Sequence, residues 1–315
     1  MDTQTLSAPT RRPRFRRAPE PPAFRVTDDD VVIIRQLARY RFLRSTHIAA
    51  LVGRSIDRTN DRLARLFHAG YLDRPRAQLD YYPTAGSAPM VYALANRGAR
   101  LLIDQYGIEL ANVDWSRKNH KAGRSFIEHQ LEIVDFQIGI HRGTRGRDDI
   151  AIMHADDLIA GMPEQPAKRN PFALRVKLSH KGAARNIAVI PDLVFGLRFR
   201  AGASYSYMVE IDRGTMPIVR SNFEQTSFER KMRAYLTAYA AKQHSQSFGW
   251  KSFRVLTVTT DEYRRKSMIE ALNRIHIPRS PGAGLFLFTT REALHYANPV
   301  GQVWQEASGK SVSLI

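Results

Sequence analysis

Three carboxylates stand at the ends of two apolar segments in residues 191–214, which read PDLVFGLRFRAGASYSYMVEIDRG. Asp192 opens the first segment directly after a proline, and Glu210 and Asp212 close the second on either side of Ile211. Side chains two residues apart in a strand point to the same face, so Glu210 and Asp212 are expected to share one. If the segments pair as an antiparallel hairpin around RFRAGASY, Asp192 comes to lie beside Glu210.

Carboxylates gathered in this way repel one another unless a cation neutralises them. Oxygen ligands alone suit Mg²⁺ or Mn²⁺, and either ion could bind phosphate oxygens and activate a water molecule. A second interpretation needs no metal: Glu210 and Asp212 pair with arginines in a structural ion network, and Asp192 is a turn residue after proline. The arginines considered for such a network are Arg213, Arg220 and Arg230.

The segments that must position these acids alternate between helix and strand patterns from residue 125 onward. Residues 125–143 carry apolar side chains with helical spacing, and their acids share the opposite face. Shorter apolar or alternating runs predict strands, and two further amphipathic runs predict helices. The expected strands lie near 150–155, 172–178, 187–195, 204–212, 253–260 and 284–290, and the expected later helices near 224–242 and 261–275. This order predicts a mixed α/β (α+β) sheet with helices on its faces.

Residues 27–106 follow a different order, in which short helices precede a hairpin. Patterns starting at Thr27, Ser45 and Ser55 predict three helices, each with a capping residue at its start. The segments YLDRPRA and MVYALA then predict two strands, and a last helix starts near Asn96. Three helices, a hairpin and a closing helix is the order of a winged helix, a variant of the helix-turn-helix.

The third of these helices separates its basic and apolar residues onto opposite faces. Arg58, Arg62 and Arg65 follow one another at helical spacing. On the second helix of a helix-turn-helix, such arginines contact phosphates and base edges of double-stranded DNA, with Arg74 and Arg76 on the next strand nearby. The alternative is ordinary solvation of an exposed helix. The residues expected on the core face are Ile56, Leu63, Leu66 and Phe67.

The composition points to a polyanionic partner. The chain has 48 Lys and Arg against 30 Asp and Glu, a net charge of +18, which favours nucleic acid over a membrane surface. A merely well-solvated basic surface is the alternative. The absence of cysteine excludes thiolate zinc sites, disulfides and cysteine nucleophiles. Without a signal peptide or an apolar run that could span a bilayer, the chain is expected in the cytoplasm with no membrane partner.

These patterns divide the chain into five segments. Residues 1–26, which mix proline with closely spaced arginines, are expected to form a disordered basic tail. Residues 107–124 read as a charged linker, and residues 296–315 as a C-terminal tail. The domains between them are a winged helix over 27–106 and an α/β domain over 125–295.

The motif PD on one strand and VEID on the next, in a helix–strand–strand–strand–helix–strand order, resembles the PD-(D/E)XK nuclease superfamily, whose domain is restriction-endonuclease-like. Over roughly residues 28–275 the chain also resembles the replication-relaxation family of plasmids and other mobile elements. The segments that carry this resemblance are LARYRFLRSTHIAALV, LARLFHAGYLDR, VYALANRGARLL, EHQLEIVDF, PDLVF and VEIDRGT.

The resemblance to the nucleases implies metal-dependent hydrolysis of phosphodiesters. Asp192 and Glu210 would hold the Mg²⁺ or Mn²⁺ ion, and Glu128 or Glu132 of the preceding helix would complete the site. Asp212 would act with Asp192 and Glu210 as a catalytic acid on the phosphodiester. His129, beside Glu128, is interpreted as a structural residue rather than a metal ligand.

The lysine of the nuclease motif normally stands two residues after the second acid, where this chain has Asp212. The motif is therefore E-x-D. Lys231 on the following helix, beside an apolar face, is the first candidate to supply the missing cation, and Arg213 is the second. Without such a cation, the phosphate would be poorly neutralised.

Two classes of function follow. The first is a DNA-binding, metal-dependent nicking endonuclease of a plasmid or mobile element. The second is a non-enzymatic DNA-binding regulator or replication accessory, in which an inactive nuclease-like domain forms a homodimer or recruits partners. A relaxase is disfavoured, because Tyr81 and Tyr82 have no accompanying histidine cluster. Nucleotide-binding loops, zinc-protease and serine-hydrolase motifs are absent from the sequence.

Overall fold

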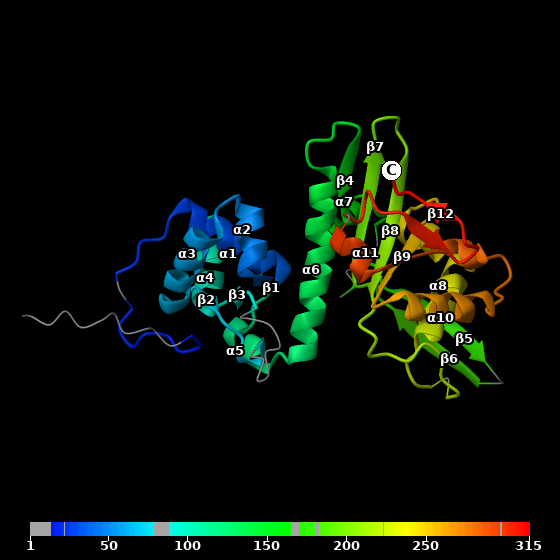
Figure 1. Cartoon of the computed structure of the whole chain (residues 1–315), viewed down its shortest axis with the longest axis horizontal. Helices are drawn as coiled ribbons and strands as arrows, with labels where there is room; N and C mark the ends of the chain where they lie inside the picture. Colours follow the sequence, from blue (N-terminus) through cyan, green and yellow to red (C-terminus); the bar gives the residue numbers. More distant parts are fainter. Residues whose placement is uncertain are drawn as a thin grey trace, which may run out of the picture. The chain divides into compact units, whose positions relative to one another are not determined.

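The computed structural model describes residues 14–21, 23–78, 88–164, 170–180, 183–222, 224–296 and 298–315. The chain divides into two compact units, Met1–Asp135 and Phe136–Ile315 (Figure 1). Helix α6 (Arg124–Thr144) contributes its first residues to the first unit and the residues from Phe136 to the second. Within the described residues, no helix is both long and apolar enough to cross a membrane.

The first unit consists of short helices and a small antiparallel sheet. Its strands pair in the order β1-β3-β2, so the last strand lies between the first two. The elements are α1 (Asp28–Tyr40), β1 (Phe42–Arg44), α2 (Ser45–Val52), α3 (Ile56–His68), β2 (Leu72–Asp73), η1 (Arg76–Gln78), β3 (Val91–Leu94), α4 (Asn96–Tyr106) and α5 (Trp115–Lys121). The predicted helices at Thr27, Ser45, Ser55 and Asn96 are therefore present.

The start of α1 is tied to α3 through a buried carboxylate. The backbone N–H of Thr27 donates to Asp30 Oδ2 at 2.8 Å, which satisfies a donor at the helix start. The guanidinium of Arg62 on α3 bonds both oxygens of the same carboxylate, with Nε 2.5 Å from Oδ1. Asp30 is fully buried, so Arg62 supplies the charge that this position requires.

The core face of α3 differs from the prediction at its first turn. Leu63, Leu66 and Phe67 are buried as expected, but Ile56 is 38% exposed. Thr59 takes the buried position instead, and its hydroxyl donates to Ser55 O at 2.9 Å. Helical spacing assigns residues to a face, but it does not show that the first turn of α3 extends beyond the core.

The expected disordered tail, residues 1–26, contacts the first unit in its described part. Arg17 donates to Phe67 O at 2.9 Å and to Leu72 O at 3.0 Å, and it pairs with Asp73 at 2.6 Å. The backbone N–H of Ala18 donates to His68 Nδ1. The guanidinium of Arg17 thus joins a carbonyl in the last turn of α3 to one on β2, long-range contacts that tail composition does not reveal. Residues 1–13 lie outside the described residues.

The expected linker, residues 107–124, contains helix α5 in place of an irregular chain. Asn119 is buried, and its amide donates to Leu94 O at 2.7 Å and to Asp73 Oδ2 at 3.1 Å. These bonds join α5 to strands β2 and β3. Next along the chain, Ile127 and Leu131 of α6 pack in a cluster with Phe42. The compact part of the first unit therefore extends beyond the predicted boundary at residue 106.

The second unit is built around one mixed sheet, as predicted. The strand order is β12-β11-β10-β9-β8-β7-β4, in which β8, β9 and β10 are parallel and the remaining pairs are antiparallel. The main strands are β4 (Ile150–Met153), β7 (Leu193–Phe199), β8 (Ser204–Ile211), β9 (Arg254–Thr259) and β10 (Phe286–Thr290). The other elements are α7 (Ala155–Ala160), α8 (Phe228–Ala240), α9 (Gln243–Phe248), α10 (Glu262–Asn273), η2 (Gly282–Leu285) and α11 (Arg291–Tyr296).

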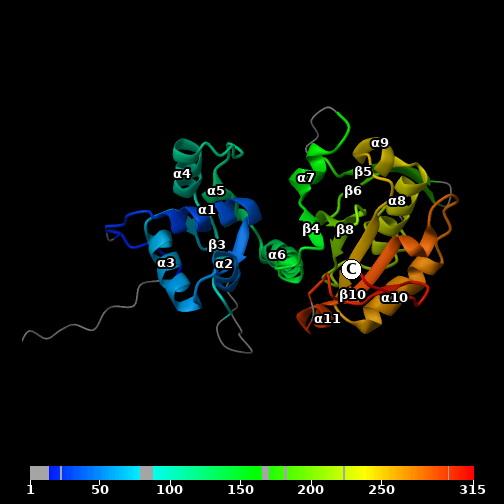
Figure 2. The ribbon, with the colours of Figure 1, turned by 90° about the horizontal axis from the view of Figure 1, so that it is seen from above.

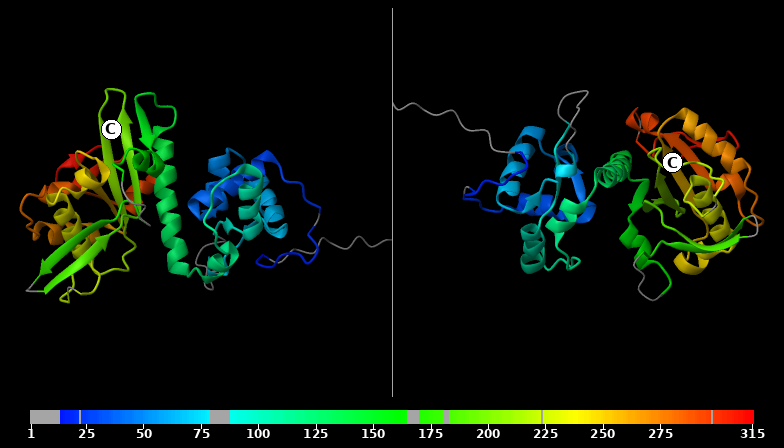
Figure 3. Two further views of the ribbon diagram at one scale, coloured as in Figure 1. Left: turned by 180° about the vertical axis from the view of Figure 1, so that it is seen from behind. Right: turned by 90° about the horizontal axis from the view of Figure 1, so that it is seen from below.

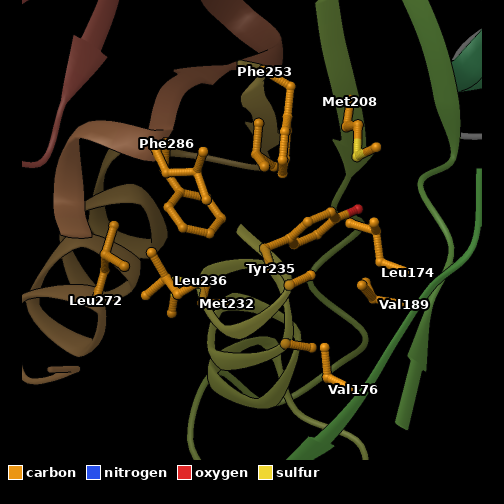
Figure 4. Close-up of a cluster of buried hydrophobic side chains, with 14 of the residues drawn as sticks. Leu174, Val176, Val189, Met208, Met232, Tyr235, Leu236, Phe253, Leu272 and Phe286 are labelled. Carbon is orange, nitrogen blue, oxygen red and sulfur yellow. The ribbon is translucent and has the colours of Figure 1, made fainter. Parts of the chain in front are cut away.

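Helices cover both faces of this sheet. Figure 2 shows α8 and α10 on one face, where Met208 and Phe286 join the main apolar cluster. Figure 4 shows the ring of Tyr235 on α8 within this cluster, close to Phe286 and Met208. On the opposite face, the ring of Phe136 contacts Phe195 and Trp304. Side chains two residues apart in a strand point to the same face of the sheet. Glu210 therefore points toward α8 and α10, as Met208 does.

The expected strand near 187–195 is two strands in different sheets. β6 (Ala183–Val189) pairs only with β5 (Leu174–His180) among the described strands, whereas β7 belongs to the main sheet. Pro191 stands between them, and proline has no N–H to continue a ladder. Apolar residues of the β5–β6 ribbon belong to the same buried cluster as those of α8. Figure 3 shows the backbone of this ribbon beside α8 from two further sides.

The expected C-terminal tail, residues 296–315, adds two strands to the sheet, β11 (Trp304–Glu306) and β12 (Ser311–Val312). Trp304 is fully buried, and its indole N–H donates to Pro299 O at 2.9 Å. Pro299 approaches α6 at Gly139, where a Cβ would lie 2.6 Å from the proline ring. Strands this short carry no periodic pattern, so the sequence does not reveal them.

Candidate active site

The pairing of β7 with β8 brings Asp192 beside Glu210. Leu193 lies opposite Val209, and the backbone N–H of Asp192 donates to Val209 O at 2.9 Å. The carboxylate of Asp192 accepts a hydrogen bond of 2.8 Å from the N–H of Ile211. The predicted antiparallel hairpin is thus confirmed, and its register places the two acids at the same end of adjacent strands.

Two residues of α8 bind the carboxylate of Glu210. Lys231 Nζ lies 2.5 Å from Glu210 Oε2, and the hydroxyl of Tyr235 donates to Oε1 at 2.6 Å. Both come from one side of α8, because residues four apart lie on the same helical face. Ser227 caps this helix by accepting from the N–H of Arg230. The lysine predicted from the following helix therefore contacts the second acid of the motif.

Burial and the neighbouring charges shift the pKa values of Glu210 and Lys231 in opposite directions. Glu210 is only 2% exposed, and burial raises the pKa of its carboxyl group, against the opposing effect of the Lys231 ammonium. Burial by itself lowers the pKa of Lys231, but the charges of Glu210 and Asp192 outweigh burial and raise that pKa overall. The pKa of Tyr235 is raised well above its ordinary value by burial and by Glu210, so the phenol remains a donor.

Asp212 has a different partner from the one that the motif suggests. Arg264 on α10 binds it through two parallel bonds, Nε to Oδ2 at 2.5 Å and Nη2 to Oδ1 at 2.8 Å. The hydroxyl of Thr259, at the end of β9, donates to Oδ2 at 2.7 Å. The hydrogen bond with Asp212 raises the pKa of Arg264. The predicted catalytic acid at 212 is therefore part of a buried ion pair that holds the end of β8.

The predicted third metal ligand lies in the other unit. Glu128 belongs to the first compact unit and pairs with Arg124 at 2.7 Å, whereas Asp192 and Glu210 belong to the second. Glu132 also belongs to the first unit. Among the described residues, no group of three or more His, Cys, Asp or Glu side chains is placed to hold a metal ion.

Of the predicted metal ligands, Asp192 and Glu210 are the two that the second unit brings together. Proteins often hold Mg²⁺ with one or two carboxylates, and water and substrate phosphate complete its coordination. A pair of carboxylates beside a lysine therefore fits such an ion in chemical type. Arg213, the second candidate cation, is half-buried directly after Asp212.

The arginines of the alternative ion network make other contacts. Arg220 donates to Thr226 O at 3.1 Å, and Arg230 donates to Thr226 Oγ1 at 2.7 Å. Arg230 also donates to Glu224 O. Both arginines therefore connect residues of the loop that precedes α8.

The arginines predicted to bind DNA fall into two groups. Arg58 and Arg65 are exposed on α3, and Arg65 pairs with Asp61 at 3.0 Å. Arg76 is exposed on η1. Arg62 is bound to the buried Asp30, so its guanidinium has a structural partner within the unit.

Arg74 also has partners within the first unit. Its guanidinium stacks 4.3 Å from the ring centroid of Phe67 and donates to the hydroxyl of Tyr92 at 2.9 Å. A further bond of 2.8 Å reaches Arg14 O. His129, which is expected to be a structural residue, is half-buried on α6. Tyr81 and Tyr82 lie outside the described residues.

A sequence model of the replication-relaxation family matches residues 34–249, which is more than half of the chain. The chain belongs to the replication-relaxation family. The match spans most of the first unit and includes Asp192, Glu210 and Lys231, but it ends before α10. No curated protein matches the chain. Membership in the replication-relaxation family supports a role in replication or relaxation of a plasmid or other mobile element.

Two site residues of this replication-relaxation protein were not predicted as partners of the acids. Tyr235 stands four residues after Lys231 on a face that was predicted to be apolar, and a buried tyrosine hydroxyl usually finds a hydrogen-bond acceptor. Arg264 gave no signal, because its contact with Asp212 joins positions that are far apart in the sequence. The helical spacing could have identified Tyr235, but only the tertiary structure identifies Arg264.

Proposed function

We propose that this replication-relaxation protein binds double-stranded DNA through its first unit and nicks a phosphodiester bond with its second unit. The observation that carries the proposal is the 2.5 Å contact between Lys231 and Glu210, beside Asp192 on the paired strand. Asp192, Glu210 and Lys231 thereby form one cluster of two acids and a cation, which are the residue types of the PD-(D/E)XK motif. The lysine comes from α8 because position 212 carries an aspartate.

The element order of the second unit supports a nuclease-like domain. The second half of α6 is followed by β4, β7 and β8 as an antiparallel meander, then by helix α8 and the parallel strand β9. This is the helix–strand–strand–strand–helix–strand order that the resemblance implies. Helix α7 and the β5–β6 ribbon are inserted between β4 and β7, and the short helix α9 is inserted between α8 and β9; the other elements keep this order.

The chemistry expected of the site follows from its contacts. Asp192 and Glu210 would hold Mg²⁺ or Mn²⁺, which supplies charge neutralisation and water activation when bound. Lys231, with its side chain partly exposed, is suited to neutralise the phosphate that is cleaved. Tyr235 holds the second oxygen of Glu210 and fixes the direction of that carboxylate. Asp212 would bind no metal, because Arg264 already engages both of its oxygens.

The first unit supports binding of DNA by a winged helix. The order of α1, β1, α2, α3, β2 and β3, with β3 central in the sheet, supports the winged helix-turn-helix that the sequence predicts. Helix α3 would be the recognition helix, with Arg58 and Arg65 as its exposed cations. The excess of 48 basic over 30 acidic residues adds non-specific attraction to phosphate.

A nicking assay on supercoiled plasmid tests the enzymatic part of this proposal. Wild type, Asp192→Ala and Asp156→Ala are incubated with Mg²⁺ or Mn²⁺, and with EDTA. Asp156 is an exposed acid on α7 and serves as the matched control. We expect metal-dependent nicking in wild type and in Asp156→Ala, and none in Asp192→Ala. Nicking that survives Asp192→Ala or EDTA contradicts the proposed site.

One observation favours a non-enzymatic accessory as the second candidate. The motif position of the lysine carries Asp212, which is engaged by Arg264, and the described residues supply no third acid for a metal. Such a protein would bind DNA without metal and lose affinity steeply with salt. Salt-sensitive binding without nicking, unchanged by Asp192→Ala, would support this candidate.

A further inference from the structure

We infer that the Lys231–Glu210 pair couples metal binding to DNA binding, so that DNA phosphate must draw Lys231 from Glu210 before the site holds a divalent cation tightly. The inference rests on the proposed function and adds the regulation of the same site. It concerns the order and strength of binding, and it involves no bond-breaking step.

The contacts of Glu210 are the first reason. Lys231 occupies Oε2 at 2.5 Å and Tyr235 occupies Oε1 at 2.6 Å. A divalent cation that binds Glu210 therefore competes with an ammonium group that already neutralises this buried carboxylate. Like charges disfavour each other strongly in a poorly solvated site, so an ion arriving alone would be repelled by Lys231.

The exposure of the two partners is the second reason. The side chain of Lys231 is 26% exposed, whereas that of Glu210 is 2% exposed. The ammonium is therefore the member of the pair that a ligand can reach from solvent. A DNA phosphate would contact Lys231 directly and compete with Glu210 for it, because both are anionic oxygen ligands of the same cation.

The charges of the cluster are the third reason. Asp192, Glu210 and Lys231 together carry one net negative charge, and Arg264 balances the remaining acid, Asp212. Binding of a divalent cation alone changes the net charge of these three residues and the ion to one positive charge. A phosphodiester group restores neutrality. Each ligand thus favours the other, and this mutual effect is reciprocal by thermodynamic linkage.

Binding of Mn²⁺ to the full chain, measured by isothermal titration calorimetry, tests the coupling. Wild type is titrated with and without a phosphorothioate duplex, which keeps the phosphate charge and is hydrolysed slowly. We expect the duplex to tighten Mn²⁺ binding to wild type by about tenfold, within the usual range of coupling between sites. Titration of the duplex alone corrects for Mn²⁺ that binds to DNA.

Lys231→Met removes the competing ammonium, so it should bind Mn²⁺ about tenfold more tightly than wild type without DNA and lose most of the duplex effect. Lys266→Met, at an exposed lysine on α10, is the matched control and should behave as wild type. The wild-type titrations with and without duplex involve no substituted chain once Mn²⁺ binding to the duplex alone has been measured and subtracted.

The outcomes separate this inference from the proposed function. Mn²⁺ binding that needs Asp192 but does not change with duplex overturns the coupling and leaves the metal site standing. Equal Mn²⁺ affinities of wild type and Asp192→Ala, with and without duplex, overturn the metal site and the coupling with it. A tighter wild-type affinity with duplex that is retained in Lys231→Met assigns the effect to another group and overturns the role of Lys231.

Discussion

Arg264 holds both carboxylate oxygens of Asp212 at 2.5 and 2.8 Å, at the motif position where the nucleases carry lysine. The two residues lie at the end of β8 and in the first turn of α10, and both are largely buried. The aspartate that interrupts the motif thus has a defined structural role. The cation that contacts Glu210 comes from α8, as Lys231.

Arg264→Met should destabilise the protein strongly, because it leaves the carboxylate of Asp212 buried without a cation. The expected loss is about 3 kcal/mol in the free energy of unfolding. Chemical denaturation measures it, and the double variant Asp212→Leu with Arg264→Met should recover most of the loss. A loss below about 0.5 kcal/mol in the single variant would show that the pair adds little.

Arg62 and Arg58 should behave differently although both are basic residues of α3. Arg62→Ala leaves Asp30 buried and unpaired, so we expect a loss of about 3 kcal/mol in stability. Arg58→Ala should leave stability unchanged, weaken DNA binding and reduce the salt slope of binding by about 1. Denaturation curves and fluorescence anisotropy at several salt concentrations separate the two effects. A stable Arg62→Ala chain would argue against the structural role of this arginine.

Tyr235→Phe tests the hydrogen bond that fixes Glu210. The substitution removes only the hydroxyl, and bonds to a charged acceptor contribute roughly 1.5–3 kcal/mol, so a stability loss near 2 kcal/mol is expected. Tyr263, whose side chain is 82% exposed, gives the control Tyr263→Phe, for which no change is expected. Urea denaturation of both variants makes the comparison. Equal stabilities of the two variants would contradict the contribution of this bond.

His244 should make stability depend on pH. Burial lowers the pKa of its imidazole below the ordinary value of 6.5, so the unfolded chain binds this proton more readily than the folded chain. Its contribution to stability is therefore complete above pH 6.5 and decreases as the pH falls below this value. His244→Phe should remove that decrease.

The phenylalanine ring should keep the stacking of His244 on Tyr239, whose ring centroid lies 4.4 Å away. Urea denaturation at pH 7.5 and pH 5.5 provides the measurement, with the variant correcting for all other titrating groups. The same loss of stability at low pH in wild type and variant would show that another group is responsible.

Local patterns in the sequence were sufficient for much of the architecture. Helical spacing identified α1, α2, α3 and α8, and apolar runs identified the main strands of the mixed sheet. The turn between two apolar segments also predicted the hairpin that places Asp192 beside Glu210. The spacing of α8 then placed Lys231 beside the apolar face of that helix. These features depend on residues close together in the chain, where the period of side chains is informative.

The tertiary structure alone decided which partners the charged residues have. From the sequence alone, the partner of Asp212 could be a metal, a lysine or an arginine. The packing of α10 against the sheet places Arg264 beside it. Arg62 and Arg58 have the same spacing pattern, yet the position of α1 gives a buried carboxylate to Arg62 alone. A charged side chain binds whichever opposite charge the fold brings near it, and that neighbour can be many residues away.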